Sequence, residues 1–213
     1  MANTEHVAIV RKGTASVSEW RDTHSGTRMD LSGADLRRAR LEHADLRGAD
    51  FSGANLYWAD LRWSDLQDCR FSQANLTRAD FHKADLENAK LDQADLRYAN
   101  LEDAELRGVD FAQAKFGNTR LFNVDLSTAR GLESCFHDGP SFTDRETFSR
   151  IDMLPDVFLK GIGLLSGYPA TVIKVVVGSP GDLAAKRDRA RESIYEWNDS
   201  NSQLRKVVLL PVL

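Results

Sequence analysis

The chain has 213 residues, of which 42% are apolar, and a formal net charge of -4. No apolar run approaches the roughly 20 residues that a membrane-spanning helix needs, and no charged-then-apolar leader opens the sequence, so we expect a cytoplasmic protein. The modest charge does not favour a nucleic-acid binder, which would be basic. We therefore expect direct contact with neither nucleic acid nor membrane, and we expect Cys69 and Cys135 to be free thiols.

Residues 1–28 are expected to form a helical cap on the rest of the chain. Val7, Val10, Val17 and Trp20 follow a helical spacing that Gly13 interrupts. This pattern predicts one or two short helices that lay Trp20 on the element that follows.

Residues 29–130 repeat a unit of five. Leu or Phe occupies every fifth position from 31 to 126, twenty positions in all, and the position two before it is nearly always small. A period of five fits neither an α-helix nor a flat strand. If each unit forms one short side and one corner, with the small residue and the Leu or Phe pointing inward, four sides close a square coil. The coils would stack like strands, about 4.8 Å apart.

The repeat resembles the pentapeptide-repeat family, whose pattern is A(D/N)LXX. The resemblance implies a mainly β fold, a right-handed quadrilateral β-helix, here of about five coils. The Asp or Asn before each central residue suits a corner, because a short carboxylate or amide can accept a hydrogen bond from a nearby backbone N–H.

One face of the predicted coil carries arginine interleaved with aromatic residues, and the next corner adds two more. This composition is typical of an interaction surface. It is also typical of cation–π stacking between neighbouring coils, which needs no partner, and both interpretations stay open. The candidate partner-binding residues are Arg37, Arg38, Tyr57, Trp58, Arg62, Trp63, Arg78, Arg97 and Tyr98.

One corner of each coil is acidic, which gives the acidic column Asp45, Asp65, Asp85, Glu105 and Asp125. Unit charges one coil apart repel by roughly 0.9 kcal/mol even in bulk water. We expect hydrogen bonds from the corner backbone to offset this repulsion rather than a basic partner.

Family members that protect gyrase are thought to imitate DNA. An inhibitor-resistance protein that binds DNA gyrase or topoisomerase is therefore the alternative function. It predicts a far more acidic surface than the 17 acidic and 14 basic residues of positions 31–130 provide.

The carboxyl-terminal part follows a different pattern. Residues 131–169 are expected to form a cap and linker with short helices, and residues 170–213 a βαβ segment, with strands at 171–180 and in KVVLLPVL around a helix at 183–197. The run VVVGSPGDL resembles the opening of a bacterial domain of unknown function that is similar to Toll/interleukin-receptor-like signalling domains. A lone βαβ unit cannot cover both faces of a parallel pair, so we expect a truncated domain or one that a partner chain completes as a dimer.

No pattern of a catalytic, cofactor-binding or metal-binding site emerges. The turn at Gly178 to Asp182 lacks the spacing and the lysine of a phosphate-binding loop, and Asp182 suits a helix N-cap. The sequence therefore predicts a non-enzymatic β-helical rod that presents a protein-binding surface in a modular bacterial signalling or defence protein. A nucleotide-handling enzyme that begins in the βαβ segment is the third possibility.

Overall fold

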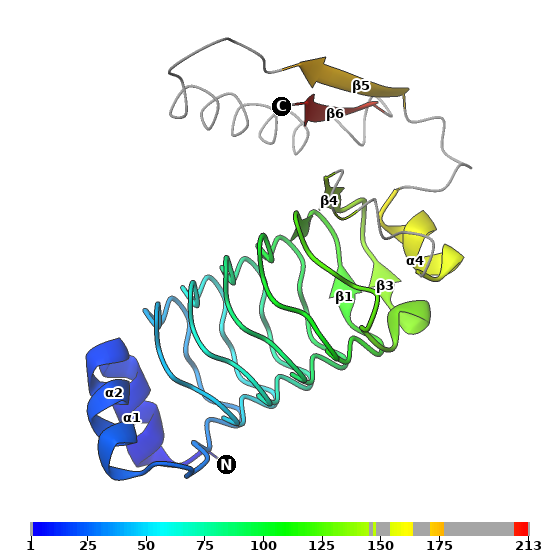
Figure 1. The fold of residues 1–213 in the computed structure, drawn as a ribbon. Coiled ribbons are helices and arrows are strands. Elements are labelled where there is room, and N and C mark those ends of the chain that lie inside the picture. Colours follow the sequence, from blue (N-terminus) through cyan, green and yellow to red (C-terminus); the bar gives the residue numbers. More distant parts are fainter. Residues whose placement is uncertain (1, 145–146, 148–153, 164–170, 177–206, 213) are drawn as a thin grey trace. The chain divides into compact units, whose positions relative to one another are not determined.

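The structure is a computed structural model that describes residues 2–144, 147, 154–163, 171–176 and 207–212. The chain divides into two compact units, Met1–Ile162 and Gly163–Leu213. Figure 1 shows the first unit as a stack of square coils that follows two short helices.

Helices α1 (Thr4–Lys12) and α2 (Thr14–Thr23) open the first unit and meet at Gly13, whose φ is 98°. The side chain of Asn3 caps α1 by accepting hydrogen bonds from the backbone of Glu5 and His6. Val10, Val17 and Trp20 are buried, as the helical spacing predicts.

Side chains of these helices take the place of a preceding coil. In later coils the carbonyl of the residue before a Leu or Phe accepts a hydrogen bond from the N–H of the Leu or Phe one coil earlier. Leu36 N, for example, donates to Asn55 O at 2.8 Å. The first coil has no predecessor, so Arg11 Nη2 donates to Asp35 O at 2.9 Å and Arg21 Nε to Asp45 O at 3.0 Å. Carbonyls at the open end of the stack thus gain hydrogen bonds.

The coil has four sides and a period of twenty residues. Parallel bridges join residues twenty apart, beginning with Asp30 to Asp50, Asp35 to Asn55, Arg40 to Asp60 and Asp45 to Asp65. The short sides expected from the repeat are present, but the mainly β expectation needs correction, because most sides contribute only a single-residue bridge and few form strands. The described strands are short and form two-stranded sheets rather than one closed sheet.

A tight turn in each unit explains why the strands are so short. The N–H of Ala39 donates to Leu36 O at 3.1 Å, and Arg38, the second residue inside this turn, has a φ of 58°. The same turn recurs along the rod, with glycine at Gly33, Gly48 and Gly53 and larger residues at most other units. Two of every five residues therefore form a turn with a left-handed residue, which is the conformation that favours glycine.

The interior of the coils is apolar. All twenty Leu and Phe positions from 31 to 126 are buried, which confirms the predicted inward set. Phe51 and Phe71 stack with ring centroids 4.8 Å apart and planes 3° from parallel. Where Cys69 replaces the small inward Ala, its thiol donates to Leu46 O, and both cysteines are free and buried.

Short elements close the far end of the first unit. Strand β1 (Lys115–Phe116) pairs with β3 (Phe136–His137), and β2 (Arg120–Leu121) pairs with β4 (Phe142–Thr143), on either side of the 3-10 helix η1 (Leu132–Ser134). Helix α4 (Asp156–Gly161) places Phe158 edge-on against the rings of Phe116 and His137. Burial lowers the pKa of His137 below its ordinary value.

The second unit contains a parallel strand pair. Strand β5 (Thr171–Val176) pairs with β6 (Val207–Val212), with Thr171 opposite Val207. Both lie within the segments expected to be strands, whereas the helix expected at 183–197 lies outside the described residues. Among the described helices, none combines the length and the apolar composition needed to cross a bilayer.

Removing one inward side chain should weaken the rod measurably. Leu76 is completely buried, so Leu76→Ala should lower the free energy of unfolding by about 2–5 kcal/mol, from lost burial and the cavity left behind. Urea denaturation followed by circular dichroism measures this change. Gln73→Ala, an exposed change in the same coil, is the control, and equal effects of the two substitutions would contradict the inward assignment.

Candidate interaction surface

The residues predicted to bind a partner lie largely on one side of the coil. Because the period is twenty, the two outward residues of this side stack into two columns, which together form what we call the arginine–aromatic face. What we call the outer column consists of the left-handed turn residues Arg38, Trp58, Arg78 and Tyr98. The other column consists of the residues just before them, Arg37, Tyr57, Thr77 and Arg97.

Arginine and aromatic side chains pair within the outer column. The Arg38 guanidinium lies 5.2 Å from the centre of the Trp58 ring, and that of Arg78 lies 5.0 Å from the centre of the Tyr98 ring. Trp58 is 51% exposed and Tyr98 is 44% exposed, so each ring is held in place while much of it stays open to solvent. The predicted cation–π stacking between coils is therefore present, and it leaves room for a partner.

The two arginines of the other column form ion pairs. Arg37 donates to both carboxylate oxygens of Asp35 and Arg97 to both of Asp95, and Arg97 also meets Asp138 at 2.9 Å. Hydrogen bonds from Arg37 lower the pKa of Asp35 to about 2. This column has more of its charge neutralised locally than the outer one.

Arg62 and Trp63 lie on the next side of the coil, around a corner from the arginine–aromatic face. Trp63 is 49% exposed; Lys83 Nζ lies 4.4 Å from its ring centre, and the His43 ring stacks on it at 5.9 Å. Lys83 and His43 were missed among the predicted site residues, although each is twenty positions from Trp63. Arg62 donates to both carboxylate oxygens of Asp60 and so belongs to an ion pair.

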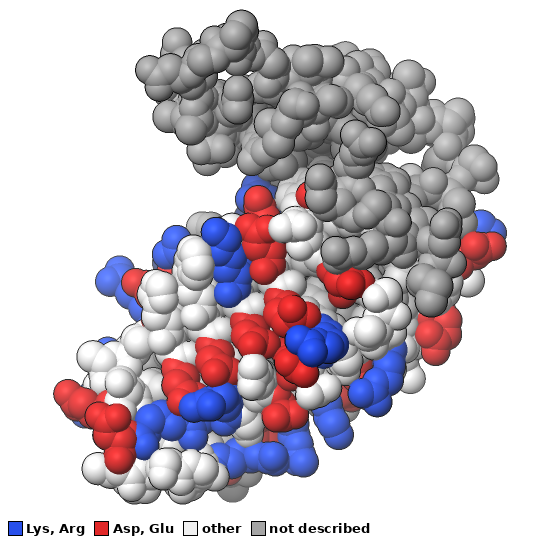
Figure 2. Space-filling view, viewed as in Figure 1, with Lys and Arg blue, Asp and Glu red and all other residues white. Residues whose placement is uncertain are grey.

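The acidic column is supported by its own backbone, as the turn chemistry predicts. Each of its five carboxylates accepts a hydrogen bond from the N–H two residues further along the chain. Arg47 also bridges two coils, with Asp45 at 2.7 Å and Asp65 at 3.3 Å. Burial, followed by the charges of Asp45 and Asp85, still raises the pKa of Asp65 above its ordinary value. Figure 2 shows acidic side chains in a row along the rod with basic side chains beside them.

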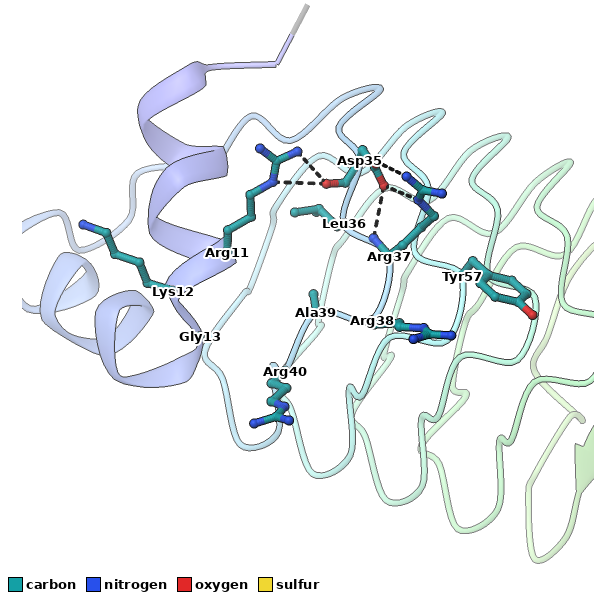
Figure 3. A pocket seen from close by; sticks show the side chains of 10 residues that line it. All are labelled: Arg11, Lys12, Gly13, Asp35, Leu36, Arg37, Arg38, Ala39, Arg40 and Tyr57. Atoms are coloured by element: carbon teal, nitrogen blue, oxygen red, sulfur yellow. Dashed lines mark hydrogen bonds and ion pairs between the residues drawn. The ribbon is translucent and has the colours of Figure 1, made fainter.

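A hollow of about 870 Å³ lies where the end of α1 meets the first coils. Figure 3 shows its lining, in which Arg11 reaches from α1 to Asp35 while Arg38 and Tyr57 come from the arginine–aromatic face. The lining also includes Lys12, Arg37 and Arg40. Arg11, Lys12 and Arg40 lie outside the predicted site. Arg11 and Lys12 reach it only because α1 places the end of the helix beside the coil.

Among the described residues, one group of side chains could hold a cation. His82, Glu102 and Asp103 each place a ligand atom within 4.8 Å of the others, a juxtaposition that the sequence analysis did not anticipate. Asp103 also accepts a hydrogen bond from Asn123 Nδ2 at 2.7 Å. The Asp103 carboxylate is thus already engaged with a protein group, and we assign no metal centre there.

A family model for pentapeptide repeats matches residues 27–53, 54–93 and 89–127, in 8 copies. Residues 27–127 are therefore pentapeptide repeats, and such repeats imply a right-handed β-helix. The match ends at residue 127, and the resemblance of the βαβ segment to Toll/interleukin-receptor-like domains is not confirmed.

Solved structures of the same family resemble the chain. A pentapeptide repeat protein from the Arabidopsis thaliana thylakoid lumen is 28% identical over 55% of this chain and 86% of its own, with a TM-score of 0.49. A pentapeptide repeat protein from Nostoc is 28% identical over 55% of this chain and 95% of its own, with a TM-score of 0.32. QnrB1, a plasmid-mediated fluoroquinolone resistance protein, is 16% identical over 67% of this chain and 76% of its own, with a TM-score of 0.43. A search of curated proteins gave no match.

Acid should weaken the ion pairs of this surface. Hydrogen bonding by Arg62 is the largest cause that lowers the pKa of Asp60 below its ordinary value of 3.8. Because the folded pKa lies below the unfolded one, the pair stabilises the fold above about pH 4, and this contribution disappears as the pH falls through the folded pKa. Arg62→Gln should therefore cost about 0.5 kcal/mol at pH 7, a small value because the pair is partly exposed, and less at pH 2.

Unfolding by urea at both pH values measures this difference. Arg78→Gln is the matched control, because the Arg78 guanidinium lies over Tyr98. Its effect should not follow the titration of a carboxylate. A cost of Arg62→Gln that is the same at pH 7 and pH 2 would contradict the assignment.

Proposed function

We propose that the chain is a non-enzymatic interaction module of a modular bacterial signalling or defence protein, and that its arginine–aromatic face binds a protein partner. The observation that carries the proposal is the pairing of exposed aromatic rings with arginines: Trp58 under Arg38 and Tyr98 under Arg78. Proteins with pentapeptide repeats are typically structural or interaction modules, which agrees with this role.

The physical argument rests on preorganisation. Trp, Tyr and Arg are the residues most often found to dominate binding energy at protein interfaces. Stacking against arginine fixes each ring before a partner arrives, which reduces the side-chain entropy lost on binding. Trp58 and Tyr98 also occupy the left-handed turn position, with φ of 60° and 62°, where a bulky residue is unfavourable. Stacking alone offers a weak reason to keep large rings there half exposed.

The alternative, a DNA-like surface that binds DNA gyrase or topoisomerase, is less well supported. Such a surface needs carboxylates that are free to meet a basic partner. Every carboxylate of the acidic column accepts a local hydrogen bond, and Asp45 and Asp65 also lie beside Arg47. Inhibition of gyrase supercoiling by the purified chain would nevertheless favour this alternative.

Three further parts of the proposal concern the setting of the module. We place the protein in the cytoplasm, although one similar structure comes from a thylakoid lumen. We propose that residues 170–213 belong to a truncated signalling domain or one completed by a partner chain, since the two strands described in this segment, β5 and β6, form a two-stranded sheet. Such an incomplete sheet also favours a homodimer.

Shortening side chains of the outer column should abolish partner binding without unfolding the rod. The double variant Trp58→Ala/Arg78→Ala removes one member of each cation–π pair, and we expect it to lose the proteins that the immobilised chain captures from its host lysate. Quantitative mass spectrometry compares the captured sets. The control, Gln73→Ala/Gln93→Ala, changes two exposed residues on another side of the coil and should retain them. An unchanged set for the first variant would remove this face from consideration.

A further inference from the structure

The hollow between α1 and the first coils differs in charge from the rest of the protein. Among its lining residues, Arg11, Lys12, Arg37, Arg38 and Arg40 are basic and Asp35 is acidic, so five positive charges face one negative charge for a formal sum of +4. The whole chain has a formal charge of -4. A local excess of this size draws anionic groups to the hollow.

The acidic residue of the hollow does not offset this excess beyond one arginine. Asp35 is paired through both carboxylate oxygens with Arg37. Arg11 donates to the backbone carbonyl of Asp35, a neutral group that leaves its charge uncompensated. The Arg38 guanidinium lies 5.2 Å from the centre of the Trp58 ring, which carries no formal charge to offset that of the arginine. Arg11, Lys12, Arg38 and Arg40 thus contribute the remaining positive charge.

The arrangement of these charges indicates several anionic groups rather than one. Figure 3 shows that the basic side chains do not converge on a point: Arg11 turns toward Asp35, while Lys12 and Arg40 extend away from it in different directions. A site for a single phosphate would need its donors aimed at one centre. A volume of about 870 Å³ is also generous for one small anion.

The surroundings favour a short segment over a long polyanion. Residues 31–130 contain 17 acidic and 14 basic residues, so a nucleic acid that continued along the rod would leave the hollow for a surface of net negative charge. On its other side the hollow continues through Arg38 and Tyr57 into the arginine–aromatic face. A protein segment suits this continuity, because its carboxylates can occupy the hollow while neighbouring residues meet the exposed rings.

We propose that the hollow binds an acidic segment, with two or more Asp or Glu side chains, of the protein partner that the arginine–aromatic face contacts. This inference rests on the proposed function and adds the chemistry of the partner. It identifies Lys12, Arg38 and Arg40 as the residues that recognise the carboxylates, with Arg11 at the back of the hollow.

The test uses a fluorescently labelled hexaglutamate peptide and the full chain, with binding followed by anisotropy at low salt. Lys12→Glu/Arg40→Glu reverses two charges of the hollow that belong to neither column of the arginine–aromatic face. We expect it to weaken binding at least about tenfold, and we expect added salt to weaken binding by the unaltered chain. The control Lys90→Glu/Lys115→Glu makes the same change in net charge elsewhere on the rod and should bind within about threefold of the unaltered chain. Circular dichroism establishes that both variants are folded.

Five outcomes would overturn the inference, four of which come from the comparisons between variants and ligands. The first is equal weakening of peptide binding by the two double variants, and the second is displacement of the peptide by millimolar inorganic phosphate at constant ionic strength. The third is binding of a single-stranded oligonucleotide more tightly than the peptide. The fourth is self-association in sedimentation that disappears only in Lys12→Glu/Arg40→Glu. Absence of peptide binding by the unaltered chain would overturn it as well.

The proposed function fails separately. If Trp58→Ala/Arg78→Ala leaves the captured proteins unchanged while the peptide result holds, the hollow still binds acidic segments, but the proposed role of the face and its link to the hollow are wrong.

Discussion

Each unit of five residues must turn the chain through one corner while keeping a Leu or Phe inside, and the rest of the structure depends on this constraint. The turn between Leu36 and Ala39 meets it with one hydrogen bond and a left-handed residue at Arg38. The residue that turns the chain also points outward. The turn that keeps a Leu or Phe inside therefore also determines which side chains form the surface. The twenty-residue period places these side chains in columns.

The period and the buried set could be predicted from the sequence because both are local properties. The small residue and the Leu or Phe recur without a break, and their burial follows once the coil closes. The twenty-residue period placed Trp58 beside Arg38. Applied to every outward residue, this period would also have placed Lys83 beside Trp63. The left-handed turn had a visible signal in the recurrence of glycine at Gly33 and Gly53, but a pattern based on hydrophobicity alone does not use it.

The hollow could not be predicted, because it depends on how α1 lies against the first coil. Residues 11 and 12 are basic near a helix end, which by itself indicates only a favourable interaction with the helix dipole. The hydrogen bonds from Arg11 to Asp35 O and from Arg21 to Asp45 O connect the helices to the coil, and no short-range pattern specifies these partners. The candidate site thus combines the columns of the arginine–aromatic face, which the repeat predicts, with the contact between α1 and the first coil, which it does not.

The most direct test of the account is whether residues twenty apart are neighbours. With Cys69 and Cys135 replaced by Ala, the pair Ser72→Cys/Asp92→Cys should form a disulfide readily under mild oxidation, because the two side chains now meet at 2.6 Å on adjacent coils. The pair Ser72→Cys/His82→Cys, half a coil apart, should stay reduced. Cross-linking of the second pair as fast as the first, read by mass spectrometry, would contradict the square coil and every surface assigned from it.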